Sequence, residues 1–315
     1  MDSQPERASG APVRGGPHGA YAAVMATGIV SVAAAEDGIA WLSWGLAAVA
    51  ACLYVALAPR AVRCLRVGDE SFAVVAATSV LGARSALAGW HAAAIGVWGA
   101  ALALWVVFWL RRPRPAAATG TRLLAAVATQ SVAVVAVLAD RRLAPAGLVL
   151  FGLGLALYVQ RASGLEPGEL RRSDGEVWVA MGALAISALA AAELALRLGG
   201  TSLRDTALAL WAAASCWIPP LAIAEARWPR RRFAPARWST VFPLGMYASA
   251  SEAAARATGM DALATVSRVA LWVAVAAWLA AAAGWLRRSF RTSGRVPDRP
   301  ERRSAEIPGP PARPP

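Results

Sequence analysis

The chain has 315 residues, 57% of them apolar, and a formal net charge of +13. All 32 basic residues are arginine, because the sequence contains no lysine. Without lysine, a Walker A nucleotide loop and a retinal Schiff base are both excluded, and an ATP-driven pump is excluded with the first. The two histidines, His18 and His91, cannot assemble an HExxH zinc site or a multi-histidine centre, so we expect no metal and no cofactor.

Ten apolar segments fill the chain from about Gly19 to Leu286. They are Ala20–Ala35, Ala40–Pro59, Ser71–Gly89, His91–Leu110, Thr121–Ala139, Pro145–Arg161, Glu176–Glu193 with a tail to Leu196, Arg204–Ala224, Ser239–Ala257 and Ala264–Leu286. A helix needs about 20 apolar residues to cross a hydrocarbon core about 30 Å thick, so each segment is long enough or nearly so. The sequence predicts an all-α polytopic membrane protein.

Arginines alternate between the gaps that separate these segments. If the amino-terminal tail defines one side of the membrane, 25 of the 32 arginines fall on that side, in both tails and in every second gap. Basic loops stay in the cytoplasm, so the pattern predicts cytoplasmic termini, an even number of helices and a place in the cytoplasmic (inner) membrane. The first segment would direct insertion itself, since no signal peptide precedes it.

Composition leaves room for one membrane domain and no second soluble one. We expect this domain to span residues 19–288, between disordered cytoplasmic tails at residues 1–18 and 289–315 that are too rich in Pro, Gly and Arg to build a core. In a soluble protein the positive charge would suggest nucleic acid. Here it is spread over loops that face anionic headgroups, so no nucleic-acid partner is expected.

Two compositional classes of segment alternate along the chain. The even-numbered segments hold ten of the fourteen tryptophans and the odd-numbered ones only Trp178, whereas Ser and Thr number 14 on odd segments and 5 on even ones. Bulky amphipathic rings favour the lipid interface, and small hydroxylated residues favour close packing and polar paths. The pattern predicts five hairpins, with odd helices in an inner ring around a central pore and even helices outside. The alternative is that the small residues only tighten packing.

Acidic side chains are confined to the segment ends, which is unusual for a proton- or sodium-coupled transporter. Glu252 is the deepest, and Arg256 follows it by one turn, so we expect a structural i,i+4 pair in preference to a coupling role. An interior of hydroxyls and backbone dipoles without acids favours anions. Arg84, inside the third segment, either extends to the interface or attracts anions to a vestibule.

Three segments carry recognisable motifs. These are Tyr21-Ala-Ala-Val-Met-Ala-Thr-Gly-Ile-Val-Ser31, Ala77-Thr-Ser-Val-Leu-Gly-Ala-Arg84 and Trp238-Ser-Thr-Val-Phe-Pro-Leu-Gly-Met-Tyr-Ala248. With ten spans, they resemble the tellurite-resistance/dicarboxylate transporter family. That family includes slow-type anion channels of plant guard cells, bacterial TehA-like channels, and proteins named malic acid or C4-dicarboxylate transporters. The resemblance covers about residues 19 to 288.

The resemblance implies five helical hairpins around a quasi-five-fold axis, with the odd helices lining a pore. In the family a phenylalanine on the ninth helix plugs the pore, and Phe242 holds the matching Phe-Pro position; rotation of such a ring would open a dewetted neck. The alternative is a packed aromatic near the cytoplasmic end. The pore-lining or helix-kinking candidates are Thr27, Gly28, Ser31, Thr78, Ser79, Pro243 and Gly245, with Arg84 as the anion-attracting candidate.

These observations favour an anion channel or facilitator, not an enzyme, that passes small inorganic or organic anions. The closest alternative is a proton-coupled transporter of a C4-dicarboxylate such as malate, or of tellurite, with Glu252 or Glu193 as proton carrier. A membrane enzyme or sensor is less favoured, since His91 has no convincing catalytic partner. The resemblance also implies a homotrimer of independent pores.

Overall fold

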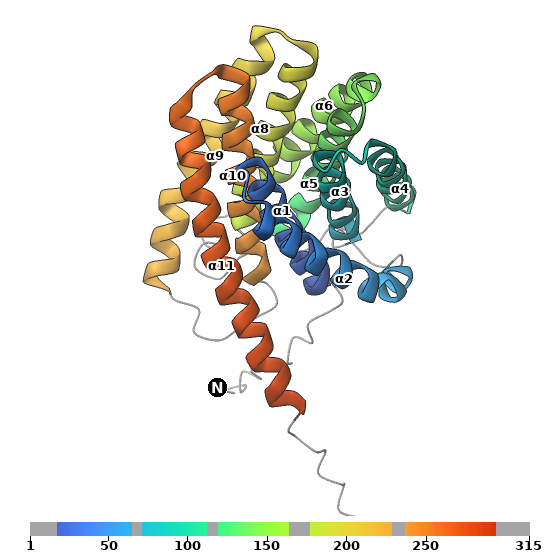
Figure 1. Cartoon of the computed structure of the whole chain (residues 1–315), viewed down its shortest axis with the longest axis vertical. Coiled ribbons are helices and arrows are strands. Elements are labelled where there is room, and N and C mark those ends of the chain that lie inside the picture. The colour runs from blue at the N-terminus through green and yellow to red at the C-terminus, as the bar shows by residue number, and fades with distance from the viewer. Residues whose placement is uncertain (1–17, 65–70, 112–118, 164–176, 229–236, 294–315) are drawn as a thin grey trace, which may run out of the picture.

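The computed structural model describes residues 18–64, 71–111, 119–163, 177–228 and 237–293 (Figure 1). Within these ranges the prediction of ten helices is confirmed, and one short 3-10 helix joins them. The elements are α1 (His18–Glu36), α2 (Ala40–Cys64), α3 (Phe72–Leu87), α4 (His91–Leu110), α5 (Thr119–Ala139), η2 (Arg141–Leu143), α6 (Ala144–Ala162), α8 (Trp178–Leu198), α9 (Thr201–Arg227), α10 (Trp238–Thr258) and α11 (Asp261–Ser293).

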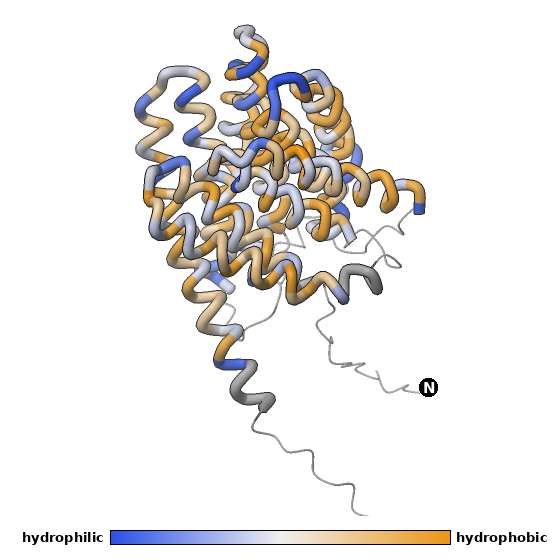
Figure 2. The backbone as a smooth tube through the Cα atoms, turned by 45° about the vertical axis from the view of Figure 1, so that its right-hand side comes forward, coloured by the Kyte–Doolittle hydropathy of each residue, from blue (hydrophilic) through white to orange (hydrophobic). Residues whose placement is uncertain are grey.

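The predicted tails lie almost wholly outside the described residues, as do many of the arginines between segments. The last helix, α11, continues to Ser293, past the expected domain boundary at residue 288, and extends beyond the rest of the bundle (Figure 1). Seven of the described helices are long and apolar enough to cross a membrane, and the apolar stretches of α1 and α3 are shorter. Figure 2 shows that apolar residues dominate the helices and that hydrophilic residues gather at their ends.

Consecutive helices pack in pairs, α1 with α2, α3 with α4, α5 with α6, α8 with α9 and α10 with α11. Short turns join the two helices of each pair. In four of the five turns a glycine takes a positive φ that other residues rarely adopt: Gly38, Gly89, Gly199 with Gly200, and Gly259. The α5–α6 turn instead uses Asp140, whose side chain accepts a hydrogen bond from the Arg142 amide at 2.8 Å. We call the end of the bundle that holds these turns the turn end, and the opposite end the terminal end.

Burial divides the helices into two sets, as the tryptophan and hydroxyl pattern predicted. The membrane-length windows of α5 and α8 are 89% and 94% buried, against 17% to 33% for α2, α4, α6, α9 and α11. Helices α1, α3 and α10 are also buried along most of their length. We call α1, α3, α5, α8 and α10 the inner helices and the other five the outer helices.

The inner helices contact one another in a closed order, α1 to α3, α5, α8, α10 and back to α1. Glycines allow the closest approaches. A Cβ atom on Gly28 would lie 2.6 Å from Val80 of α3, and one on Gly245 would lie 2.9 Å from Ile29 of α1. Small residues therefore tighten this ring, as they do in many membrane helix packings.

A repeated hydrogen bond joins neighbouring pairs. An aromatic side chain on the outer helix of one pair bonds a hydroxyl on the inner helix of the next pair. The four examples are Tyr54 with Thr78 (2.6 Å), Trp105 to Thr129 (2.8 Å), Trp211 to Ser251 (2.9 Å) and Trp278 to Thr27 (2.9 Å). The described residues show no equivalent bond from α6 to α8. The last of the four links the fifth pair back to the first, so the pattern closes on itself.

Candidate pore

A small cavity of about 20 Å³, open at one side, lies between the inner helices. Every inner helix contributes to its wall. The lining residues are Ile29, Val32, Glu36, Ser79, Val80, Ala83, Ser131, Val134, Val135, Leu138, Ile186, Leu189 and Met246. Because these residues come from five separate segments, the cavity exists only once the ring of inner helices has closed.

The wall is mostly aliphatic, with two hydroxyls and one carboxyl among the lining side chains. Ser131 donates a hydrogen bond to the Val127 carbonyl at 2.8 Å, so its hydrogen is already engaged. Ser79 is only 1% exposed, and its Oγ has no hydrogen-bond partner. An unpartnered buried hydroxyl is costly, and Ser79 presents one in the cavity wall.

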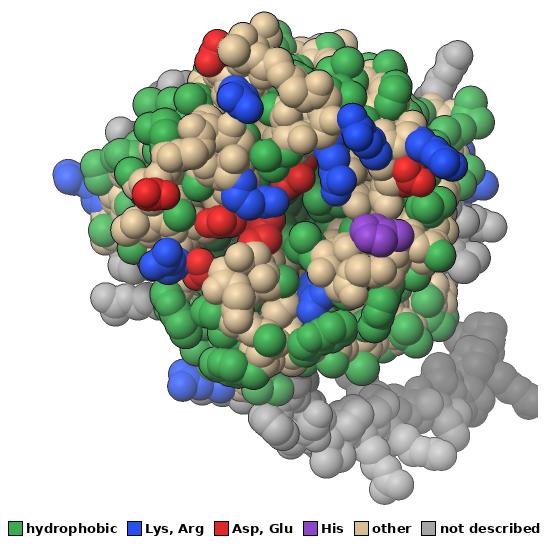
Figure 3. All heavy atoms as spheres, turned by 45° about the horizontal axis from the view of Figure 1, so that its top comes forward, with side chains coloured by type: hydrophobic (Ala, Val, Ile, Leu, Met, Phe, Trp, Pro, Cys, Tyr) green, Lys and Arg blue, Asp and Glu red, His purple; other side chains and the backbone are tan. Residues whose placement is uncertain are grey.

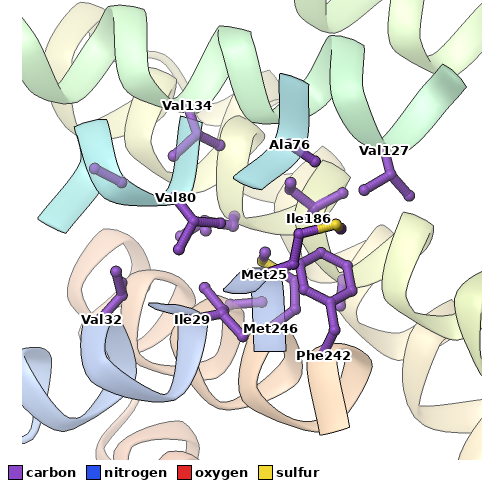
Figure 4. Close-up of a cluster of buried hydrophobic side chains, with 14 of the residues drawn as sticks. Met25, Ile29, Val32, Ala76, Val80, Val127, Val134, Ile186, Phe242 and Met246 are labelled. Carbon is purple, nitrogen blue, oxygen red and sulfur yellow. The ribbon is translucent and has the colours of Figure 1, made fainter. Parts of the chain in front are cut away.

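Buried apolar side chains continue the cavity wall toward the terminal end, and Figure 4 draws them as one cluster with residues of the wall. Four inner helices each place one side chain among them, one turn before a residue of the cavity wall: Met25, Ala76, Val127 and Phe242. All four are buried, and Phe242 is only 3% exposed. In Figure 4 the Phe242 ring lies beside Met25, Met246 and Ile186. We call these four residues the closing layer.

The turn end of the cavity carries charge. The Arg256 guanidinium, at Nη2, donates a hydrogen bond of 2.7 Å to Glu193 and lies 3.5 Å from Glu36. The side chains of Glu36 and Glu193 are only 6% and 3% exposed. Figure 3 shows acidic and basic side chains around a central hollow on this face.

A second ion pair lies next to this group. Arg268 Nε is 3.6 Å from Asp37 Oδ1. Asp37 lies in the turn between α1 and α2, where partial burial raises the pKa of its carboxyl and Arg268 opposes that rise. This pair is close to neutral when both groups are charged.

The predicted pore-lining residues occupy three different environments. Ser79 alone among them belongs to the cavity wall. Thr27 and Thr78 bond aromatic side chains on outer helices, and Ser31 Oγ donates to the Ser43 carbonyl at 2.7 Å. The other three are packing positions: Gly28 and Gly245 at close helix contacts, and Pro243 within 3.0 Å of where a Cβ on Gly182 would lie.

Arg84 lies between α3 and α2, outside the cavity wall. Its Nε donates to Ser43 Oγ at 2.9 Å, and its guanidinium stands 4.1 Å from the ring centre of Trp44. The side chain is 8% exposed. This places it at the interface between an inner and an outer helix, with a cation–π contact that offsets part of its desolvation.

The predicted pairing of Arg256 with Glu252 is wrong. The ion pairs of Arg256 within the described residues go to Glu193 and Glu36. Sequence spacing could identify only the neighbour on the same helix, whereas ring closure brings α1 and α8 to the same place. The sequence did contain an indication of this cluster, because Glu36, Glu193 and Glu252 all lie at the turn ends of odd-numbered segments.

These features define a polytopic membrane protein built around a cavity that its inner helices share. Residues 17–286 match the voltage-dependent anion channel family, and the chain belongs to that family, whose members are channels and transporters. Two similar proteins are the uncharacterized membrane proteins MT1776 and Rv1735c of Mycobacterium tuberculosis, from strains CDC 1551 and H37Rv. Each is 30% identical over 155 residues, covering 45% of this chain and 74% of the relative.

Proposed function

We propose that this protein is an anion channel or facilitator whose path follows the axis of the inner helices. The observation that carries the proposal is the cavity walled by all five inner helices in a chain of the voltage-dependent anion channel family. Small anions such as chloride, nitrate, sulfite or malate are the substrate class. A weakly binding, aliphatic wall with few polar groups suits rapid passage better than tight recognition.

The arrangement proposed for the fold is five hairpins around a quasi-five-fold axis. Three repeated features support it: the glycine turns, the closed order of inner-helix contacts, and the aromatic-to-hydroxyl bond between successive pairs. The last bond, from α11 to α1, is what a ring requires and an open row of hairpins would lack. A homotrimer of such units is part of the proposal, with the exposed outer helices as its contact surface.

Phe242 is the proposed gate. Its ring is the largest side chain of the closing layer, and the other three members are flexible or small. An apolar neck of this kind excludes ions by dewetting, and movement of one ring would open it. Pro243 follows directly and removes a backbone donor from α10, which permits local bending.

The arginine pattern supports the sidedness. Along the sequence, both tails and the gaps between successive helix pairs carry 25 of the 32 arginines, so the terminal end and both termini are proposed to be cytoplasmic in the inner membrane. The cavity mouth then faces the outside, and the closing layer lies between it and the cytoplasm.

The test is anion current in bilayers that contain the purified protein, with Phe242→Ala against the parent. We expect Phe242→Ala to increase the current at least about tenfold, because the dewetted neck is removed. Phe108→Ala is the matched control. Phe108 is equally buried, 3% exposed, but it lies on the outer helix α4. The control loses comparable packing, so its current should stay at the parent level.

Two results would contradict the proposal. Unchanged current in Phe242→Ala, with the protein still folded, removes Phe242 as the gate. Absence of anion current in both proteins, whatever the anion, removes the channel function itself.

A proton-coupled dicarboxylate or tellurite transporter of the same fold is the second candidate. It is favoured by the burial of Glu193 and Glu36 at the cavity mouth, where a carried proton could be held. Coupled transport would make uptake of labelled malate depend on a pH gradient and would shift the zero-current potential with pH. A channel would show neither.

A further inference from the structure

The charged groups at the cavity mouth do not balance one another. Glu36 of α1, Glu193 of α8 and Glu252 of α10 surround the single guanidinium of Arg256, and Glu252 interacts electrostatically with both Glu36 and Arg256. Three carboxylates against one arginine leave an excess of negative charge when all are ionised. Such a mouth repels the anions that the cavity is proposed to pass.

Of the two carboxylates that pair with Arg256, Glu36 has its negative charge less well compensated. Its Oε1 lies 3.5 Å from Arg256 Nη2, whereas Glu193 Oε1 holds the same nitrogen at 2.7 Å. Its Oε2 is buried and makes no hydrogen bond of normal geometry, although the Ser249 hydroxyl of α10, which has no other partner, is close enough to act on this carboxyl. Glu36 is also the one carboxyl in the cavity wall, so an uncompensated buried oxygen belongs to the path itself.

Among the described residues, the charged groups that act on Glu36 are Arg256, Glu193 and Glu252, and no further cation corrects the imbalance. Asp37 and Arg268 of α11 pair with each other at 3.6 Å. On α3, Arg84 donates to Ser43 and stacks on Trp44, and α2 carries no charged residue near its start at Ala40. The described residues contain no group of three His, Cys, Asp or Glu side chains that could hold a metal ion.

A second polar group in the cavity wall, the Ser79 hydroxyl, can donate a hydrogen bond to an anion. Ser79, on α3, is buried and unpartnered in the same cavity wall. Ionised Glu36 can only accept hydrogen bonds, so it offers an anion at the mouth no donor. Protonated at Oε2, Glu36 becomes a donor at the mouth, and Ser79 offers a second donor deeper in the cavity, since Val80 packs level with Gly28 of α1.

We propose that Glu36 is a proton-binding site that controls anion entry from the turn end. This inference rests on the proposed channel function. With Glu36 ionised, the mouth carries excess negative charge and anions are excluded. A proton from the outer solution binds Oε2, which halves the excess negative charge of the mouth and removes the one carboxylate from the cavity wall. The Glu193–Arg256 pair stays self-compensating, Glu252 lies outside the wall, and the cavity accepts an anion. The proton stays on Glu36 and does not cross with the anion.

The experiment is anion current while the pH on the turn-end side is lowered from about 8 to about 5, a range that covers perturbed carboxyl groups. The parent current should rise about tenfold, the scale on which a local charge changes ion concentration at a cleft. Glu36→Gln should carry the high current throughout. Arg256→Gln should carry less current than the parent at every pH. Because a misfolded variant would also lose current, thermal unfolding of each variant is measured as well.

Asp37→Asn is the matched control, because it removes the neighbouring carboxyl outside the cavity. It should keep the pH response of the parent. Three results would overturn the inference: a parent current indifferent to pH on that side, a Glu36→Gln protein that keeps the parent response, or a zero-current potential that follows the pH gradient. If no current appears in the parent, in Phe242→Ala or in Glu36→Gln, the channel function fails instead.

Discussion

The two ends of the central cavity differ in chemistry, and in the proposed channel they would obstruct ions by different physics. Toward the terminal end the closing layer is apolar and buried, so it would exclude ions of either sign by dewetting. At the turn end the mouth is charged, so it would act on the sign of the ion. Conduction and selection are therefore proposed to be separable, about two to three helical turns apart along the inner helices.

The two ends also depend differently on the fold. The closing layer needs one short segment from each of four helices, and its members are ordinary core residues. The mouth depends on contacts between distant parts of the chain: Arg256 meets Glu193 across 63 residues and Glu36 across 220. Its charge pattern therefore exists only when α1, α8 and α10 are correctly closed.

The largest expected effect comes from changing both ends together. In the double variant Phe242→Ala with Glu36→Gln, the closing layer no longer excludes ions and the mouth no longer repels them. If the mouth sets the supply of anions and the layer sets their passage, the two increases multiply to about a hundredfold over the parent at neutral pH. Current from reconstituted protein, normalised to the amount inserted, measures this.

A double variant that conducts no better than Phe242→Ala alone would show that the mouth has no control once the layer is open. The two regions would then act as one gate, and the separation drawn above would be wrong. The single variants, recorded in the same bilayers, supply the comparison.

Much of the fold was predictable because membrane insertion constrains the sequence to a few simple patterns. Segment length, arginine alternation and the tryptophan-against-hydroxyl contrast predicted ten helices and identified which five are buried. The roles of the hydroxyls were harder to predict. Thr27 and Thr78 lie on inner helices as expected, but a hydroxyl buried in a membrane protein needs a partner, and theirs are aromatic residues of neighbouring pairs.

The mouth could not be predicted for a related reason. Periodicity along one helix shows only neighbours three or four residues apart, so it paired Arg256 with Glu252. The observed partners come from other helices, and no local rule ranks contacts across 63 or 220 residues. Ser79 was selected because of its hydroxyl, and only the structure shows that it lacks the partner that Ser131 has.

A smaller effect is expected from the hydroxyl between the two ends. Ser79→Ala removes a free donor from the cavity wall and should lower the anion current roughly threefold to fivefold, the scale of one hydrogen bond. Ser131→Ala is the matched control, because that hydroxyl already donates to Val127 and offers less to an anion. Equal losses in the two variants would mean that Ser79 has no special part in the path. Stability should not fall in Ser79→Ala, since an unpartnered buried group is removed.

The smallest effect on current is expected at Thr27, which lies two residues from Met25 of the closing layer but bonds outward to Trp278. Thr27→Val leaves the indole N–H unpaired and should cost about 1 to 3 kcal/mol of stability. Trp278→Phe should cost less at the hydrogen bond itself, and the double variant should reveal a coupling of about 1 kcal/mol. Thermal and denaturant unfolding in detergent measure these changes in stability.

Because the Thr27–Trp278 bond lies on the face of α1 turned away from the cavity, current per folded channel should stay near the parent value. A change in current as large as that of Ser79→Ala would mean that the closing layer is held shut from outside the ring. The packing of whole hairpins would then determine the position of the closing layer. The Phe242 ring would move with the hairpins instead of acting alone.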